Sequence, residues 1–110
     1  MGVNTQQLVI LGVSVPMDKV EYEQIEDFSF SYWEKPKDIC CAYDGMSGDY
    51  CIIGKPLAYT YEDKEYFAND PIKLNNFESD RAEIVNFIEE KLGLKHSTND
   101  VNLYAITHHS

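Results

Sequence analysis

Three cysteines and three histidines are the side chains of this sequence with the greatest capacity for chemistry. Cys41 and Cys51 are expected to face each other across a hairpin, about equally far from its tip, where zinc would need His96 or His108 as further ligands. The spacing does not favour zinc, because there is no Cys-x-x-Cys pair and the adjacent Cys40 and Cys41 point to opposite faces of a strand. Nucleophilic catalysis needs a cation that lowers the pKa of the thiol, and the surroundings are acidic. We therefore expect core thiols, no metal site and no cofactor.

The histidines offer a second possible chemistry. His96-Ser-Thr98 and His108-His-Ser110 both fit the pattern His-x-Ser/Thr. This pair of motifs resembles the signature of the 2H phosphoesterases, in which two histidines meet across a groove as general acid and base. The resemblance implies a small enzyme as the alternative to a binding protein. The motifs are only twelve residues apart, and we interpret His96 as a loop residue and His108 as part of a polar tail that frays.

Carboxylates are abundant, so their pairing alone indicates no site. The segment 44–49 has two glycines, but Asp44 and Asp49 flank them and would repel phosphate. Its spacing also lacks the calcium-binding pattern of an EF-hand. A plain hairpin turn is the preferred interpretation.

Charge excludes one class of partner. The 110 residues contain 19 Asp and Glu against nine Lys and Arg, which gives a formal charge of −10. Such a chain repels nucleic-acid phosphates and anionic membranes and favours partners with basic surfaces. The longest apolar stretch, residues 8–15, is too short to cross a membrane and follows no basic residue that would make it a signal peptide. An odd number of cysteines without a secretion signal indicates reduced thiols and a cytoplasmic protein.

Tyrosines gather in the middle third of the sequence. A tyrosine combines a large apolar contact with a polar tip, which is the composition of interface cores. Beside carboxylates, such side chains are suited to docking onto Arg and Lys. The alternative is that they simply cover the sheet.

Strands are indicated in five places, one of them short. Residues 6–15 form a β-rich apolar run that ends at Pro16, and residues 39–43 and 50–61 flank the glycine turn of a hairpin. Pro56 predicts an edge or a bulge in the hairpin's second strand. A short extra strand is expected near Tyr66. Residues 101–106 are predicted to form a final strand.

The first helix is expected to be short, with Asp18 as its N-cap. Met17, Val20, Ile25 and Phe28 then fall on one side of it. The opposite side carries acidic residues: Glu23, Glu26 and Asp27.

The second helix has the clearer pattern. We expect Ser79 or Asp80 to cap it, with Glu83 completing a capping box. Its apolar residues recur at four-residue spacing: Ile84, Ile88 and Leu92. Gly93 ends it in the left-handed conformation.

These elements predict one α+β domain over residues 1–110. Their order is strand, helix, strand, strand, helix, strand, which fits a two-layer sandwich with both helices on one face of a mainly antiparallel sheet. The commonest form of this order is the ferredoxin-like β-α-β-β-α-β fold.

In size, acidity, lack of a catalytic set and lack of targeting signals, the chain resembles the small accessory proteins of bacteriophages, some of which block host defence enzymes. The resemblance rests on overall character and implies an inhibitor that acts in the host cytoplasm. We expect a non-catalytic protein that docks on the basic surface of a larger protein, such as a nucleic-acid-binding or defence protein. The expected contact residues are Glu23, Glu26, Asp27, Tyr43, Asp44, Asp49, Tyr50, Tyr59 and Tyr61.

Other functions stay open at this point. Nucleic-acid mimicry is a sharper version of the same hypothesis, although the acidic residues are scattered singly among aromatics. A small enzyme or ligand-binding domain, similar to the 2H phosphoesterases, is the alternative from another class. A structural subunit is the third, and a homo-oligomer is compatible with each.

Overall fold

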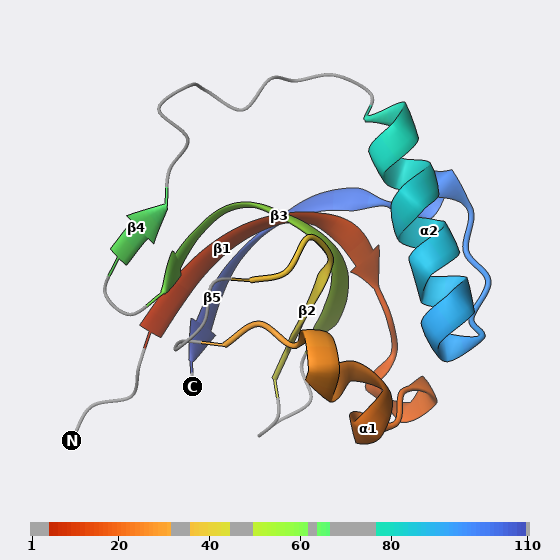
Figure 1. Cartoon of the computed structure of the whole chain (residues 1–110), viewed down its shortest axis with the longest axis horizontal. Coiled ribbons are helices and arrows are strands. Elements are labelled where there is room, and N and C mark those ends of the chain that lie inside the picture. The colour runs from red at the N-terminus through yellow and green to blue at the C-terminus, as the bar shows by residue number, and fades with distance from the viewer. Residues whose placement is uncertain (1–4, 32–35, 45–49, 62–63, 67–76, 110) are drawn as a thin grey trace.

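The computed structural model describes residues 5–31, 36–44, 50–61, 64–66 and 77–109. Within them an antiparallel sheet curves into an arch, and two helical segments pack against one of its faces (Figure 1). The strands are β1 (Thr5–Ser14), β2 (Cys40–Tyr43), β3 (Cys51–Tyr61), β4 (Lys64–Tyr66) and β5 (Asn102–His109). The expected α+β class, with an antiparallel sheet and two helices, is therefore confirmed.

β1 lies inside the sheet between β3 and β5, and the strand order is β2-β3-β1-β5. All neighbouring strands are antiparallel. β4 pairs with the last residues of β3, beyond the stretch that pairs with β2. The strands expected at 6–15, 39–43 and 50–61 are confirmed to within a residue at each end, and so is the extra strand near Tyr66.

The last strand is longer than the sequence predicts. β5 continues to His109 instead of ending at Ile106, because the first residues of β1 extend the ladder and Thr5 pairs with His109. The interpretation of His108 as part of a fraying tail is therefore wrong, since its backbone lies opposite Gln6 in the sheet.

Pro56 of β3 lies at a bulge, one of the two outcomes that the sequence predicts. Ile10 of β1 pairs with Pro56, whereas Val9 pairs with Ala58. Leu57 is therefore the extra residue. On its other side, Pro56 lies between the stretches of β3 that pair with β2 and with β4. Proline lacks an N–H group, and no ladder on that side requires one here.

The first helical segment differs from the single helix that was expected. It consists of three short pieces: η1 (Met17–Lys19), α1 (Tyr22–Ile25) and η2 (Glu26–Phe28). Val20 is extended (φ −124°, ψ 128°) and interrupts the helix. The N-cap of α1 is therefore Glu21 and not Asp18. Glu21 forms a capping box with Gln24, whose side-chain oxygen accepts a hydrogen bond from the Glu21 N–H at 3.0 Å.

The second helix, α2 (Glu78–Leu92), confirms the four-residue apolar spacing. Ile84 and Ile88 are fully buried against the sheet. Gly93 follows the helix with φ 70°, as the sequence predicts, and its N–H donates to the Glu89 carbonyl at 2.9 Å. No helix in the described ranges is long and apolar enough to cross a membrane.

The start of α2 corrects the expected cap. The N-cap is Phe77, in a left-handed conformation (φ 51°), and neither Ser79 nor Asp80 takes that position. The reason lies in β3, where the Lys55 ammonium contacts Asp80 at 3.0 Å and Glu83 at 2.8 Å. These bonds, the one to Glu83 foremost, raise the pKa of Lys55. The two carboxylates attach the helix to the sheet instead of capping it.

Two apolar clusters lie on opposite faces of the sheet. On the helix side, Leu11 of β1 belongs to the same cluster as Ile25 and Ile88. On the other side, Leu8 and Ile10 belong to a second cluster. The alternation of side chains along β1 therefore supplies both cores, and full burial of each aliphatic side chain stabilises the fold by about 1.5–3 kcal/mol.

Gly12 of β1 and Gly54 of β3 lie opposite each other in the sheet. A Cβ atom on Gly12 would overlap the carbonyl group of Ile53, and one on Gly54 would overlap that of Leu11. The two strands approach too closely here for any side chain, which explains both glycines.

Candidate functional site

The three thiols lie in the core, as expected. Cys40, Cys41 and Cys51 are each 0% exposed. Cys40 belongs to the cluster on the open face and Cys41 to the cluster beneath the helices, so the neighbouring side chains do point to opposite faces. The described part of the chain contains no group of three metal-binding side chains.

Cys41 and Cys51 form a close pair, with their Sγ atoms 3.5 Å apart. Their hydrogen bond and their burial raise the pKa of Cys41 far above its usual value. The same bond lowers the pKa of Cys51, against the effect of burial. Burial alone raises the pKa of Cys40 to about 12. No exposed nucleophile results, because all three sulfur atoms are enclosed.

The two histidine motifs lie at opposite ends of β5. His96 belongs to the loop between α2 and the 3-10 turn η3 (Thr98–Asp100), which leads into the start of the strand. His108 is near the other end, six residues beyond Asn102, which is a distance of about 20 Å along a strand. The His96 Nδ1 is buried and has no hydrogen-bond partner among the described residues. The arrangement does not bring the two motifs to one groove.

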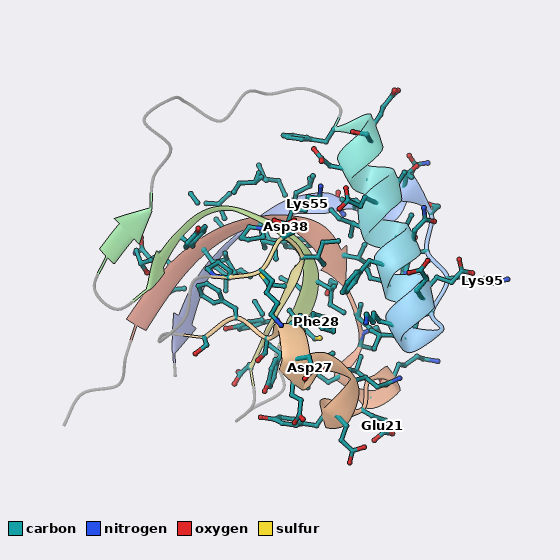
Figure 2. The ribbon with its side chains drawn as sticks, in the orientation of Figure 1. Glu21, Asp27, Phe28, Asp38, Lys55 and Lys95 are labelled. Carbon is teal, nitrogen blue, oxygen red and sulfur yellow. The ribbon has the colours of Figure 1, made fainter. Side chains whose placement is uncertain are left out.

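The predicted acidic residues form one exposed surface. Glu23 of α1 and Glu26 and Asp27 of η2 are all exposed. Figure 2 shows Glu21 and Asp27 on this segment at the side of the molecule away from β5. None of the three predicted carboxylates has an ion-pair partner among the residues that the structure describes. The Asp27 backbone carbonyl accepts a hydrogen bond from Lys37 Nζ at 2.6 Å, which ties η2 to the segment before β2.

Tyr22 joins this acidic surface to the hairpin of β2 and β3. Its ring lies edge-on to the Tyr43 ring, with 5.6 Å between centroids and 89° between planes. Burial, and then a hydrogen bond with Tyr22, raise the pKa of Tyr43 above its usual value. Tyr22 is 60% exposed and has Glu21 and Glu23 as its chain neighbours. We use the name acidic tyrosine patch for six residues: Glu21, Tyr22, Glu23, Glu26, Asp27 and Tyr43.

The other predicted tyrosines do not join the patch. Tyr50 and Tyr59 are half-buried against the cluster on the opposite face of the sheet, whereas Tyr43 packs against the cluster beneath the helices. Tyr61 ends β3, and its side chain lies outside the described residues. Tyr50 and Tyr59 therefore cover the sheet, which is the alternative to a role in binding that the sequence left open.

The two acidic residues of the turn are only partly described. Asp44 is half-buried, and its N–H donates to the Tyr50 carbonyl at 3.0 Å, which closes the hairpin on the side of the strands. Asp49 lies outside the described residues.

A groove next to the patch was not predicted. It has a volume of about 450 Å³ and separates η2 and the residues before β2 from α2. Phe28 and Phe87 form an edge-on ring pair in its lining, with centroids 5.1 Å apart. The Lys91 ammonium lies 5.9 Å from the centroid of the Phe87 ring. Its lining also includes side chains of both charges: Asp27, Lys37, Asp38, Glu83 and Lys91.

Sequence reasoning missed Tyr22, the most exposed large apolar side chain in the described residues. The available signal was its place between two glutamates at the start of the helix, where an apolar ring has no core position to fill. The contact of Tyr22 with Tyr43 could not be predicted, because only the tertiary fold brings the two rings together.

No protein-family model, curated protein or solved structure matches this chain.

Proposed function

We propose that this chain is a non-catalytic binding protein that docks on the basic surface of a larger protein through the acidic tyrosine patch. The observation that carries the proposal is Tyr22, a largely exposed ring held against Tyr43 and flanked by carboxylates. Tyrosine is enriched among the residues that dominate binding energy, because it buries a large ring and loses little side-chain entropy.

The carboxylates around Tyr22 contribute differently from the ring. Glu23, Glu26 and Asp27 are exposed and have no described ion-pair partner, so they are free to meet Arg and Lys of a partner. Rim charges of this kind mainly accelerate association and suppress wrong partners. Steric blocking of the partner's basic surface would then be the mechanism of inhibition, and a nucleic-acid-binding or defence protein is a partner of suitable charge.

The cysteines support action in a reducing compartment such as the cytoplasm of a bacterial host. Cys41 and Cys51 are close enough to contact each other, yet both are free thiols. A reducing compartment would keep these thiols unbonded, because disulfides are rare in cytosolic proteins.

We also propose that the fold is ferredoxin-like. The order of the elements along the chain and the inner position of β1 and β3 support this proposal. The first connection departs from a regular β-α-β unit, because α1 has only four residues.

Affinity capture from lysate of a candidate bacterial host tests the docking proposal. The immobilised wild-type chain should retain one stoichiometric partner with a basic surface. Tyr22→Ala should retain about tenfold less, which corresponds to the loss of roughly 1.4 kcal/mol at one anchoring side chain.

A matched pair of charge variants locates the contact. Glu23→Lys with Glu26→Lys should release the partner, whereas Glu89→Lys with Glu90→Lys, at exposed positions of α2, should retain it. Both pairs change the net charge from −10 to −6, since each reversal adds two units. Equal capture by the wild type and Tyr22→Ala, or no stoichiometric partner at all, would contradict the proposal.

A further inference from the structure

β5 differs from the rest of the chain in charge. No Asp, Glu, Lys or Arg occurs in residues 101–110, although the chain has 19 acidic and nine basic residues. Strands at the edge of a sheet usually carry a charged side chain, a proline or a bulge that prevents pairing with another molecule. β5 has none of these devices: its ladder with β1 is regular from Asn102 to His109.

The two edges of the sheet differ in whether another segment of the chain contacts them. At β2, the outer edge is occupied by the chain itself, since the Phe30 N–H donates to the Cys41 carbonyl at 2.8 Å and Ser29 bridges to Cys41. At the opposite edge, β5 pairs with β1 alone among the residues that the structure describes. Nothing in the described ranges pairs with the N–H and C=O groups on the outer side of this eight-residue strand, and such groups are a template for another strand.

The side chains of β5 are apolar or neutral on both faces. On the helix side, Leu103 is 48% exposed, and Ala105 and Thr107 are exposed. Helix α2 does not cover this row. On the other side, Tyr104 and Ile106 are half-buried against the second cluster. A strand laid beside β5 would extend both of these surfaces.

We propose that β5 pairs with β5 of a second copy of this chain, antiparallel and about a twofold axis near Ala105. Two chains that each carry −10 repel each other, and a neutral edge is where they can approach most closely. An antiparallel pair of identical strands is also self-complementary, as a twofold interface requires. In this register, Leu103 of each copy lies opposite Thr107 of the other, on the same face of one continuous sheet.

The proposal is independent of the acidic tyrosine patch. β3 and β1 separate β2 from β5, so the two edges of the sheet are about 14 Å apart. The α1 segment packs on the helix side of the sheet, and the chain after it reaches the outer edge of β2, where Ser29 bridges to Cys41. A dimer through β5 would present two patches to the outside. A basic partner would be drawn to those patches and not to the neutral strand.

The contact is small, and this determines the kind of dimer to expect. An eight-residue ladder is about 27 Å long and one sheet thick. It buries less than the roughly 1,200–2,000 Å² of a standard interface, so association should be reversible and depend on concentration.

Sedimentation of the intact chain from about 1 μM to about 1 mM tests the proposal. The mass should rise with concentration from 12.7 kDa towards twice that value. Leu103→Lys with Thr107→Lys places like charges opposite each other in the dimer and should keep the chain monomeric over the whole range. Ser79→Lys with Asn86→Lys makes the same charge change at exposed positions of α2 and should behave as the wild type.

Amide hydrogen exchange of the wild type gives a second measurement that needs no variant. Exchange in β5 should slow as the concentration rises, while exchange in β2 should not change. A wild type that stays monomeric, as it would if β5 instead receives a strand from a different protein, overturns the proposal. So does dimerisation of the Leu103→Lys, Thr107→Lys variant at the wild-type concentration, or loss of the dimer in both double variants.

Discussion

Burial decides what the chemically capable side chains of this protein can do. The three cysteines carry thiols that are capable of chemistry, but each is fully enclosed, as the sequence predicts. A thiol without water around it holds its proton, because the thiolate would lose its hydration. The consequence of the raised pKa values is therefore seen in stability and not in catalysis.

Cys40 supplies the clearest case for a pH prediction, because burial alone raises its pKa from 9.0 to about 12. Between these values the unfolded chain releases a proton that the folded chain keeps, so stability is fully present below pH 9 and falls as pH rises towards 12. From pH 7.5 to pH 10 the wild type should lose about 1.4 kcal/mol more than Cys40→Ala. Urea unfolding of both proteins at the two pH values measures this difference, and equal losses would show that Cys40 ionises freely in the fold.

At the residue scale, the sequence predicts burial better than contact. The core positions of the cysteines follow from their apolar neighbours and the strand pattern. The pairing of Tyr22 with Tyr43 does not, because the two residues belong to elements that only the tertiary fold brings together. Tyr50 and Tyr59 look like Tyr43 in sequence, yet they lie on the other face of the sheet.

At the scale of elements, two glycines are required for different reasons, one for its backbone conformation and the other for the close approach of two strands. Gly93 has φ 70° and open space where a Cβ would be, so Gly93→Ala should cost about 1–2 kcal/mol through its left-handed conformation alone. At Gly54 a Cβ would overlap the backbone of β1. Gly54→Ala should therefore cost more, because two paired strands must move apart. Urea midpoints rank the two variants, and a smaller loss for Gly54→Ala would contradict the close approach of the strands.

The elements also show where sequence signals are sufficient. α2 has an uninterrupted apolar period and a glycine stop, and both appear in the structure. The α1 segment has apolar residues at irregular spacing, and the extended Val20 divides it into three short pieces. The capping signals at Asp18 and Asp80 failed for different reasons. Asp18 caps no α-helix, because it lies in the three-residue η1 turn that the extended Val20 ends. Asp80 does not cap α2, because its carboxylate forms an ion pair with Lys55 of β3.

At the scale of the whole molecule, the sequence predicts the class and the order of elements. The strand order depends on which strands pair over long range, and the length of β5 depends on β1 offering a partner for each residue up to His109. Charge is the global property that was most informative. From the charge of −10 we predict repulsion of nucleic-acid phosphates and anionic membranes. In the fold, several of the acidic residues lie around the exposed ring of Tyr22.

The association rate with the captured partner tests the central claim most directly. At about 0.1 M salt, Glu23→Lys with Glu26→Lys should slow association at least tenfold, and wild-type association should slow as salt rises to about 1 M, where charges are screened beyond ~3 Å. Glu89→Lys with Glu90→Lys makes the same change in net charge and should stay close to the wild-type rate. Stopped-flow mixing measures all three proteins. Rates that do not respond to salt or to the patch reversal, or equal slowing by both double variants, would contradict docking through the acidic tyrosine patch.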